Sequence, residues 1–354
     1  MTADSKGKRS GTGPGRASRP SLPETAGKVE IEVRDRPGGP SRALPVHLVY
    51  PRGGLAGVGP GTGLMLSLHN WGGTIWDNTP DPNVLAGQYD VVAIGVTYYQ
   101  SGDKGNEEET EPYDFGYVQA MDAIRALHYV YCSLRDAGRA FDRGRIYCTG
   151  GSGGGNVTLM ANKFAPNTFA CIVDFSGMAA LTDGIAYRLP GGGRMSARYS
   201  RDPASPAYLS RDMQEIRDPG HPTHLALQAK SANRCKIVVI HGEDDVPCPV
   251  ADKRRMTDAM RAAGMDVEPH FISAADVDGQ TIVNSAHQIG NRTALLMRFA
   301  GPYLSPESAA MRRLASPCDF DRRQAIAYPT SGGVHVISYA GETPALRFDA
   351  ASPR

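Results

Sequence analysis

Short runs of apolar, mostly β-branched residues recur along the chain and predict strands. The first two runs are short and alternate apolar with polar positions, whereas the later ones are nearly continuous. Continuous apolar runs are typical of strands that are buried on both faces of a parallel sheet. The runs are VEIEV (29–33), VHLVY (46–50), GLMLSL (63–68), YDVVAIGVTY (89–98), RIYCT (145–149), FACIVDF (169–175), CKIVVIHG (235–242) and VEPHFI (267–272).

Between these strands, apolar positions recur every three or four residues, which is the period of an amphipathic helix. The segment 116–135 places Val118, Met121 and Ile124 on one apolar face, and further helices are predicted at 156–164, 250–263 and 291–300. The alternation of strands and helices predicts an α/β fold with a mostly parallel central sheet and helices on both faces. The first two strands are predicted to form an antiparallel edge at the N-terminal side.

Shifts in composition divide the chain. Residues 1–28 are rich in Gly, Pro, Ser and Arg and are predicted to be a disordered N-terminal arm. Residues 29–304 carry the strand–helix alternation and form the predicted main domain. A Pro-, Gly- and Arg-rich insertion at about 176–234 interrupts it, and we expect this insertion to form a cap. Residues 305–354 form a C-terminal extension, in which two alternating runs around SGG predict a β-hairpin.

The overall composition excludes several function classes. The formal net charge is +1, so no global field favours nucleic acid or an anionic membrane surface. The chain has no apolar stretch near the ~20 residues of a membrane span, and its start lacks the apolar core of a secretory signal. The six cysteines form no C-x-x-C pair, so neither a metal site nor a redox site is predicted. No cofactor is predicted either. A reduced, cytoplasmic protein is expected.

Five glycines surround one serine in TGGSGGGN, between a predicted strand and a predicted helix. The cluster lacks the Lys of a phosphate-binding P-loop and the G-x-G-x-x-G frame of a dinucleotide site. It does contain G-x-S-x-G, from Gly150 to Gly154. This motif is a nucleophile elbow, a strained turn that holds the serine oxygen clear of the backbone. Ser152 is therefore the predicted nucleophile.

A serine nucleophile needs a base and an acid, which follow it in the chain in this kind of site. The loop after the strand CKIVVIHG carries adjacent carboxylates, of which Asp245 has the expected spacing and Asp244 is the rival. His287 lies in a polar loop before the helix at 291–300, whereas His270 lies within a strand pattern. We therefore expect Asp245 and His287 to complete a triad with Ser152.

The stabilisers of a tetrahedral intermediate are expected next to the elbow. The turn HNWGG follows the strand 63–68, and a turn at this place supplies one backbone N–H, while the residue after the nucleophile supplies the other. The predicted donors are Trp71 and Gly153, although Asn70 stands where such turns usually carry glycine. Tyr98 and Tyr99, at the end of the strand 89–98, are predicted to border the substrate pocket.

Together these residues resemble the α/β-hydrolase superfamily, including its prolyl-oligopeptidase-like and dienelactone-hydrolase-like esterases. Within it, the segment after the elbow is similar to the poorly characterised bacterial hydrolases of the DUF2920 type. Those proteins continue from the elbow helix into an AKxAP turn and an xVIDxS strand. The matching positions here are Ala161, Lys163, Ala165 and Pro166 in the turn, and Ile172, Val173, Asp174 and Ser176 in the strand.

The expected function is that of a serine hydrolase, which cleaves an ester, amide or thioester bond of a small-molecule acyl substrate through an acyl-enzyme. An acyltransferase would use the same triad but pass the acyl group to an alcohol. A catalytically silent hydrolase fold that only binds ligands is a third reading, and the intact serine, acid, histidine and glycine set argues against it.

Overall fold

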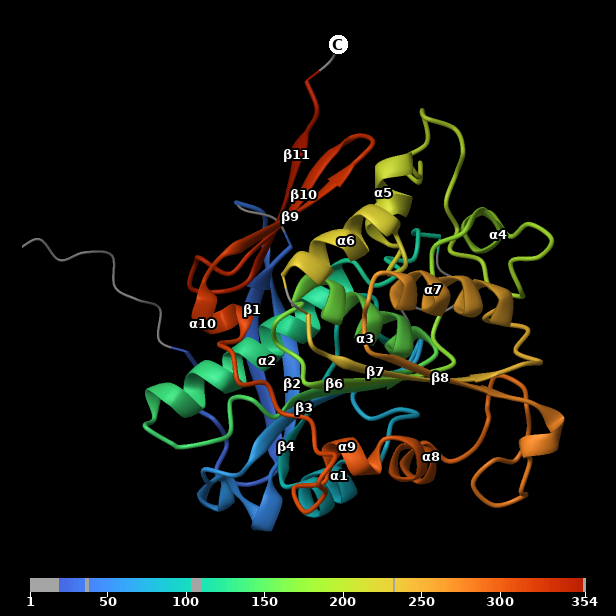
Figure 1. The fold of residues 1–354 in the computed structure, drawn as a ribbon. Coiled ribbons are helices and arrows are strands. Elements are labelled where there is room, and N and C mark those ends of the chain that lie inside the picture. The colour runs from blue at the N-terminus through green and yellow to red at the C-terminus, as the bar shows by residue number, and fades with distance from the viewer. Residues whose placement is uncertain (1–18, 36–37, 103–109, 232, 353–354) are drawn as a thin grey trace, which may run out of the picture.

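The computed structural model describes residues 19–35, 38–102, 110–231 and 233–352, and its centre is an eight-stranded sheet (Figure 1). The strands lie in the order β1-β2-β4-β3-β5-β6-β7-β8. Their bounds are β1 Gly27–Arg34, β2 Ser41–Val49, β3 Gly63–Leu68, β4 Val91–Val96, β5 Ile146–Gly151, β6 Cys171–Phe175, β7 Lys236–Gly242 and β8 Val267–Ile272.

The strand directions confirm the predicted sheet. β1 pairs antiparallel with β2, and β2 pairs antiparallel with β4. Every other pairing in this sheet is parallel. Because parallel strands point their carboxyl ends toward one edge, the loops after β3, β5, β7 and β8 gather at that edge.

Helices cover both faces of the sheet, as predicted. Figure 1 shows α2 (Val118–Asp136), α3 (Gly153–Phe164) and α7 (Val250–Ala262) on one face. The other face carries α1 (Pro82–Tyr89), α8 (Arg292–Phe299) and α9 (Gly301–Leu304). An apolar core lies on each face of the sheet, under the helices that cover it. Strand β7 contributes alternate side chains to these two cores, because successive residues of a strand point to opposite faces. Ile237 and Val239 belong to the core under α2 and α3, and Val238 and Ile240 to the core over α8.

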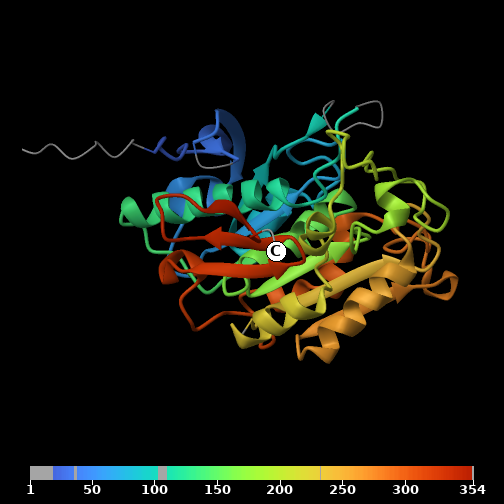
Figure 2. The same cartoon turned by 90° about the horizontal axis from the view of Figure 1, so that it is seen from above.

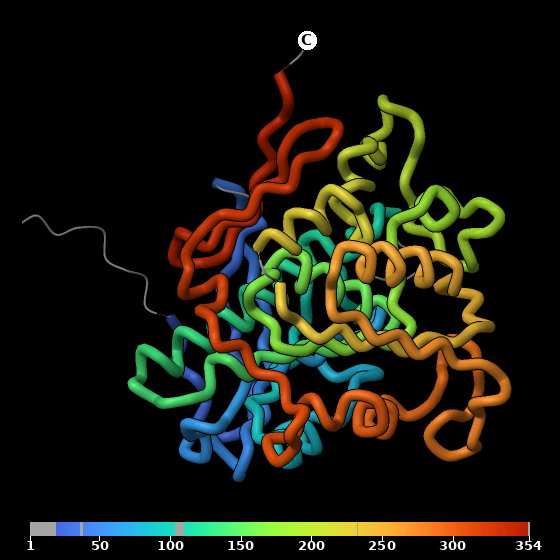
Figure 3. The backbone as a smooth tube through the Cα atoms, viewed as in Figure 1, coloured from blue at the N-terminus to red at the C-terminus, as the bar shows by residue number. Residues whose placement is uncertain are grey.

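The segment between β6 and β7 leaves the sheet and packs on itself (Figure 3). It contains α4 (Asp183–Ala186), α5 (Arg211–Ile216) and α6 (Pro222–Lys230). A separate apolar core joins this segment to the loop before α2 and to the loop after β7; its buried members are Tyr113, Phe115, Met178, Leu181, Ile185, Ala186, Ala197, Leu209 and Cys248. The insertion therefore packs against loops at the carboxyl edge of the sheet.

The C-terminal extension begins with α10 (Asp319–Arg322) and forms a second, antiparallel sheet of β9 (Ala325–Thr330), β10 (Gly333–Ser338) and β11 (Ala345–Ala350). The β9–β10 hairpin matches the prediction, whereas β11 was not predicted. Figure 2 shows this sheet lying over the helices of the α2–α3 face. Its Tyr328 hydroxyl donates to the Lys163 carbonyl, and its Tyr339 hydroxyl donates to the Phe164 carbonyl at 3.0 Å.

The N-terminal boundary differs from the predicted one. Residues 1–18 of the expected disordered arm lie outside the described residues, but residues 19–28 are described. Leu22 is buried in the main core, and β1 already begins at Gly27. Residues 27 and 28 pair with β2, which satisfies their backbone groups and draws them into the sheet.

The remaining helical turns are short. They are 3₁₀ segments at Pro51–Gly53, Leu55–Gly57 and Ala274–Asp276. None of the helices in the described part of the chain is both long and apolar enough to cross a bilayer.

Candidate active site

Ser152 occupies a strained turn between β5, which ends at Gly151, and α3, which begins at Gly153. Its φ of 55° and ψ of −119° lie outside the regions that L-residues usually adopt. Such strain costs about 1–3 kcal/mol and persists only where the surroundings hold it. Here the Ser152 N–H donates to the Phe175 carbonyl at 2.8 Å, and the Ser152 carbonyl accepts from the Asn156 N–H at 3.1 Å.

The glycines of the elbow are required by close approaches of the backbone. A Cβ on Gly150 would lie 2.3 Å from the Gly154 carbonyl oxygen, and one on Gly154 would lie 2.2 Å from the Leu68 carbonyl oxygen. No side chain fits at such distances, so only glycine lets strand β3, strand β5 and helix α3 meet here. The sequence pattern G-x-S-x-G therefore follows from packing at this turn.

The structure brings the three predicted triad residues together. The Ser152 Oγ lies 2.9 Å from His287 Nε2, and His287 Nδ1 lies 2.8 Å from Asp245 Oδ2. A carboxylate only accepts hydrogen bonds, so Nδ1 carries the proton of a neutral imidazole. Nε2 is then the acceptor that faces the serine hydroxyl.

Adjacent Asp244 and Asp245 lie in opposite environments. The Asp245 side chain is fully buried, and its Oδ1 accepts the Cys248 N–H at 2.8 Å. Asp244 is exposed, and its Oδ2 accepts the Ser285 hydroxyl at 2.5 Å. Only Asp245 contacts His287, so the geometry favours Asp245 over its rival.

His270, the other histidine weighed as the base, and the buried carboxylate of Asp174 both make other contacts. His270 is on β8, where its Nε2 lies 2.8 Å from a Glu268 carboxylate oxygen. Asp174, on β6, forms a buried ion pair with Lys253 of α7, and its other oxygen accepts the Gly177 N–H at 2.9 Å. The His270 contact lies within β8, whereas the Asp174 ion pair joins β6 to α7.

The two predicted oxyanion donors lie against each other. A Cβ on Gly153 would lie 2.6 Å from the Trp71 backbone nitrogen, so this turn passes directly beside the start of α3. The first N–H groups of a helix have no intrahelical partner and carry its positive dipole end. The Trp71 ring stacks on Tyr113 with a centroid distance of 3.6 Å, and Arg198 of the insertion lies 5.9 Å above it. The insertion thus reaches the edge of the elbow.

His69 fixes the turn that carries Trp71. Its Nδ1 donates to the Asn70 carbonyl at 2.8 Å, and its Nε2 lies 2.8 Å from the Ser101 hydroxyl. Burial lowers the pKa of His69 to about 4, which keeps the ring neutral at pH 7. His69 therefore supports the turn and does not act as a second base.

The predicted substrate contacts Tyr98 and Tyr99 do not lie at the triad. Tyr98 is buried, stacks on the His69 ring at 3.9 Å and donates its hydroxyl to the His69 carbonyl. Tyr99 lies at the β2–α2 side, where its ring is 5.4 Å from the Arg42 guanidinium. Tyr98 follows the end of β4 and packs inward behind the turn, and a substrate contact of either tyrosine stays a prediction.

The sequence analysis missed Arg292, at the first position of α8. The central carbon of its guanidinium lies 2.0 Å from the point that a Cβ on Gly151 would occupy. The guanidinium also donates to the Asn78 carbonyl. Burial lowers its pKa to about 10. Together with His287 and Ser176, Arg292 lines a small cavity behind the elbow. Arg292 thereby joins the loop after β3 to the turn that carries Ser152.

Comparison with solved structures identifies the fold. The acylaminoacyl peptidase of Pyrococcus horikoshii matches 78% of the chain with a TM-score of 0.52 and 14% identity. A puromycin-hydrolyzing peptidase of Mycobacterium tuberculosis matches 80% with a TM-score of 0.55 and 21% identity. Dipeptidyl peptidase 4 of Porphyromonas gingivalis matches 77% with a TM-score of 0.52 and 16% identity. The matched part is 40%, 40% and 35% of those chains, respectively, so the likeness covers less than half of each peptidase.

No curated protein matches the sequence. The family model described as "Protein of unknown function (DUF2920)" matches residues 194–347. This match agrees with the resemblance found in the sequence, although it covers the insertion, the acid and base loops and the C-terminal sheet rather than the elbow. The chain therefore has the α/β-hydrolase fold, and its C-terminal half matches the DUF2920 family.

Proposed function

We propose that the chain is a serine hydrolase that cleaves an acyl bond through a covalent acyl-enzyme. The observation that carries this proposal is the unbroken hydrogen-bonded series from Ser152 Oγ through the His287 ring to Asp245 Oδ2, with distances of 2.9 and 2.8 Å. A hydroxyl, an imidazole and a carboxylate in this order are the elements of an activated serine.

In the first half-reaction, His287 Nε2 takes the proton of Ser152 as the oxygen attacks the substrate carbonyl carbon. Asp245 holds the proton on Nδ1 and balances the charge of the imidazolium that forms. The protonated imidazole then gives its proton to the leaving group. In the second half-reaction, the oxygen of a water attacks the acyl carbon while Nε2 takes one of its protons. The bond between the acyl group and Ser152 Oγ then breaks, Oγ takes the proton back from Nε2, and the free acid leaves.

The negative charge of the tetrahedral intermediate falls on the former carbonyl oxygen. We assign its stabilisation to the backbone N–H groups of Trp71 and Gly153. The contact between these two residues, and the position of Gly153 in the first turn of α3, support this assignment. Each such donor typically contributes about 10²–10³-fold in kcat.

The proposed substrate is a small molecule with an ester, thioester or amide bond. The solved structures that share the fold are named as peptidases, which favours testing aminoacyl amides beside esters. The partly buried Trp71 ring packs against the apolar core of the insertion, and this apolar surface beside the proposed oxyanion donors favours an apolar acyl group. No cofactor takes part in the proposed steps.

The test is hydrolysis of p-nitrophenyl acyl esters and aminoacyl amides by the full chain and by Ser152→Ala. We expect the substitution to reduce kcat by at least about 10⁴-fold, because the nucleophile is lost, with an unchanged melting temperature. A fluorophosphonate probe should label the native chain and not the variant. Equal turnover by both proteins would refute the proposal. Consumption of an ester without release of free acid would identify an acyltransferase, and an unlabelled native chain would indicate a binding protein.

A further inference from the structure

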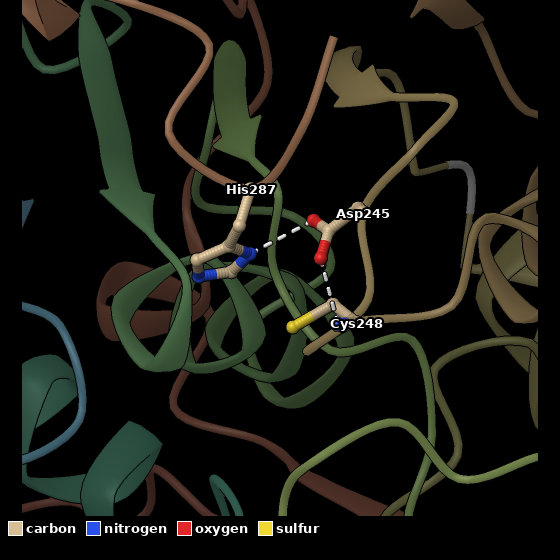
Figure 4. Close-up of side chains that lie close together, drawn as sticks. All are labelled: Asp245, Cys248 and His287. Atoms are coloured by element: carbon tan, nitrogen blue, oxygen red, sulfur yellow. Dashed lines mark hydrogen bonds and ion pairs between the residues drawn. The ribbon is translucent and has the colours of Figure 1, made fainter.

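Cys248 lies beside the acid and the base, and the proposed hydrolysis makes no use of its thiol. Figure 4 shows its sulfur next to the His287 ring and the Asp245 carboxylate. One ligand atom from each of the three residues, a carboxylate oxygen, Sγ and an imidazole nitrogen, lies within 4.8 Å of the other two.

The backbone fixes Cys248 in this place. Its N–H donates to Asp245 Oδ1 at 2.8 Å, and its carbonyl accepts from His241 Nε2 at 2.8 Å. Because a carbonyl oxygen only accepts hydrogen bonds, the buried His241 ring donates through Nε2. Cys248 itself is 3% exposed, whereas the His287 side chain is 18% exposed and opens the cluster to solvent.

A thiolate, an imidazole and a carboxylate are the three side-chain types that bind Zn²⁺, at about 2.0–2.3 Å from the ion. Ligand atoms around one tetrahedral ion are then about 3.3–3.8 Å apart. The spacing of the three atoms here is close enough that small side-chain rotations bring them to one centre. Three protein ligands also leave a fourth position for water.

We propose that Asp245, Cys248 and His287 form a Zn²⁺ site, and that occupation of this site reversibly inhibits the hydrolase. The inhibition rests on the proposed function, whereas the binding does not. Zinc replaces the proton on the Cys248 sulfur, which leaves to solvent, and it takes the lone pair of His287 Nδ1. The single proton of the neutral ring moves to Nε2, so Nε2 no longer accepts the Ser152 proton.

The first arm of the test measures zinc binding by equilibrium dialysis of the full chain against ZnCl₂. Ser152→Ala is used beside the native chain, because Ser152 is not a ligand and the variant should bind zinc equally well. Cys248→Ala and Cys248→Ser should weaken binding at least about tenfold, since the loss of an outer-sphere partner alone already weakens metal sites by about 10–100-fold. Cys235→Ala removes another buried thiol, just before β7, and should leave binding unchanged.

The second arm measures ester hydrolysis over a zinc series, with each protein normalised to its own zinc-free rate. Zinc should inhibit the native chain and Cys235→Ala alike, EDTA should restore the rate, and Cys248→Ala should need at least about ten times more zinc. Equal zinc binding by the native chain and Cys248→Ala would overturn the proposal, as would no binding at all. A chain that hydrolyses nothing but binds zinc through Cys248 would refute the proposed function and leave the site standing.

Discussion

At the scale of single residues, two adjacent carboxylates have different roles because their surroundings differ. Asp245 is buried and lies 2.8 Å from His287 Nδ1, whereas Asp244 is exposed and accepts the Ser285 hydroxyl. In the proposed reaction, the buried carboxylate holds the imidazole tautomer, and the exposed one acts mainly on its loop.

The matched variants Asp245→Asn and Asp244→Asn test this assignment. Asp245→Asn should lower kcat by about 10⁴-fold, because an amide can hold the wrong tautomer of His287. Asp244→Asn should change kcat by less than about tenfold. Steady-state hydrolysis of one activated ester measures both. Comparable losses in the two variants would remove Asp245 from the triad.

That Ser152, Asp245 and His287 lie together could be predicted from the sequence, because each residue stands in a local pattern. Ser152 lies in a glycine pattern imposed by backbone contacts, and Asp245 and His287 follow it on loops after strands. Arg292 and Cys248 leave no such signal, because a charge at a helix start and a lone cysteine are common. Their roles depend on contacts with Gly151 and Asp245 that only the folded chain creates.

At the scale of elements, helix α7 is joined to strand β6 by one buried ion pair. Lys253 Nζ donates to Asp174 Oδ2, and both side chains are fully buried. Asp174 also accepts the Gly177 N–H, which fixes the turn after β6. A buried pair of this kind contributes less than its Coulomb energy suggests, but a single remaining partner is strongly unfavourable.

We therefore expect Lys253→Met to lower the free energy of unfolding by about 3–5 kcal/mol, because the Asp174 charge stays buried without its cation. The double variant Asp174→Asn, Lys253→Met should be more stable than Lys253→Met alone. Urea unfolding of the three proteins measures both effects. A double variant that is less stable than the single one would show that the Asp174 charge is compensated by other groups.

Elements with a strong pattern of apolar residues could be predicted, and elements with a weak pattern could not. The strands buried on both faces and the helices α2, α3, α7 and α8 follow continuous or periodic apolar runs. Helix α1 is as long as α8, but its start at Asp81 and Pro82 resembles a turn in sequence. Strand β11 has a single fully buried residue, Leu346, so its pattern is weak without its partner β10.

At the scale of the whole molecule, the insertion and the C-terminal sheet meet over helix α3. His224 of α6 donates from Nε2 to the Pro329 carbonyl of β9 at 2.9 Å, and its ring lies 5.1 Å from Tyr328. Its Nδ1 is buried without a hydrogen-bond partner among the described residues. The ring of His221 lies 4.2 Å away, and the buried Lys163 ammonium is also close. A proton on Nδ1 would thus enter an unfavourable site.

Burial, together with Lys163, lowers the pKa of His224 to about 3, from 6.5. Between pH 6.5 and pH 3, His224 binds a proton in the unfolded chain but not in the folded chain. The free energy of unfolding is therefore undiminished above pH 6.5, and it decreases as the pH falls toward 3. At pH 5 this loss is about 2 kcal/mol relative to pH 7. His224→Gln keeps a donor for Pro329 but cannot titrate, so its free energy of unfolding should fall less, by about that amount, over the same interval.

Urea unfolding of the native chain and His224→Gln at pH 7 and pH 5 measures the difference. His47→Gln, at a half-buried position of β2, is the control and should change the pH dependence less. Equal losses of stability in the native chain and His224→Gln would mean that His224 takes up its proton within the fold. The folded chain would then hold a charged His224 ring at pH 5.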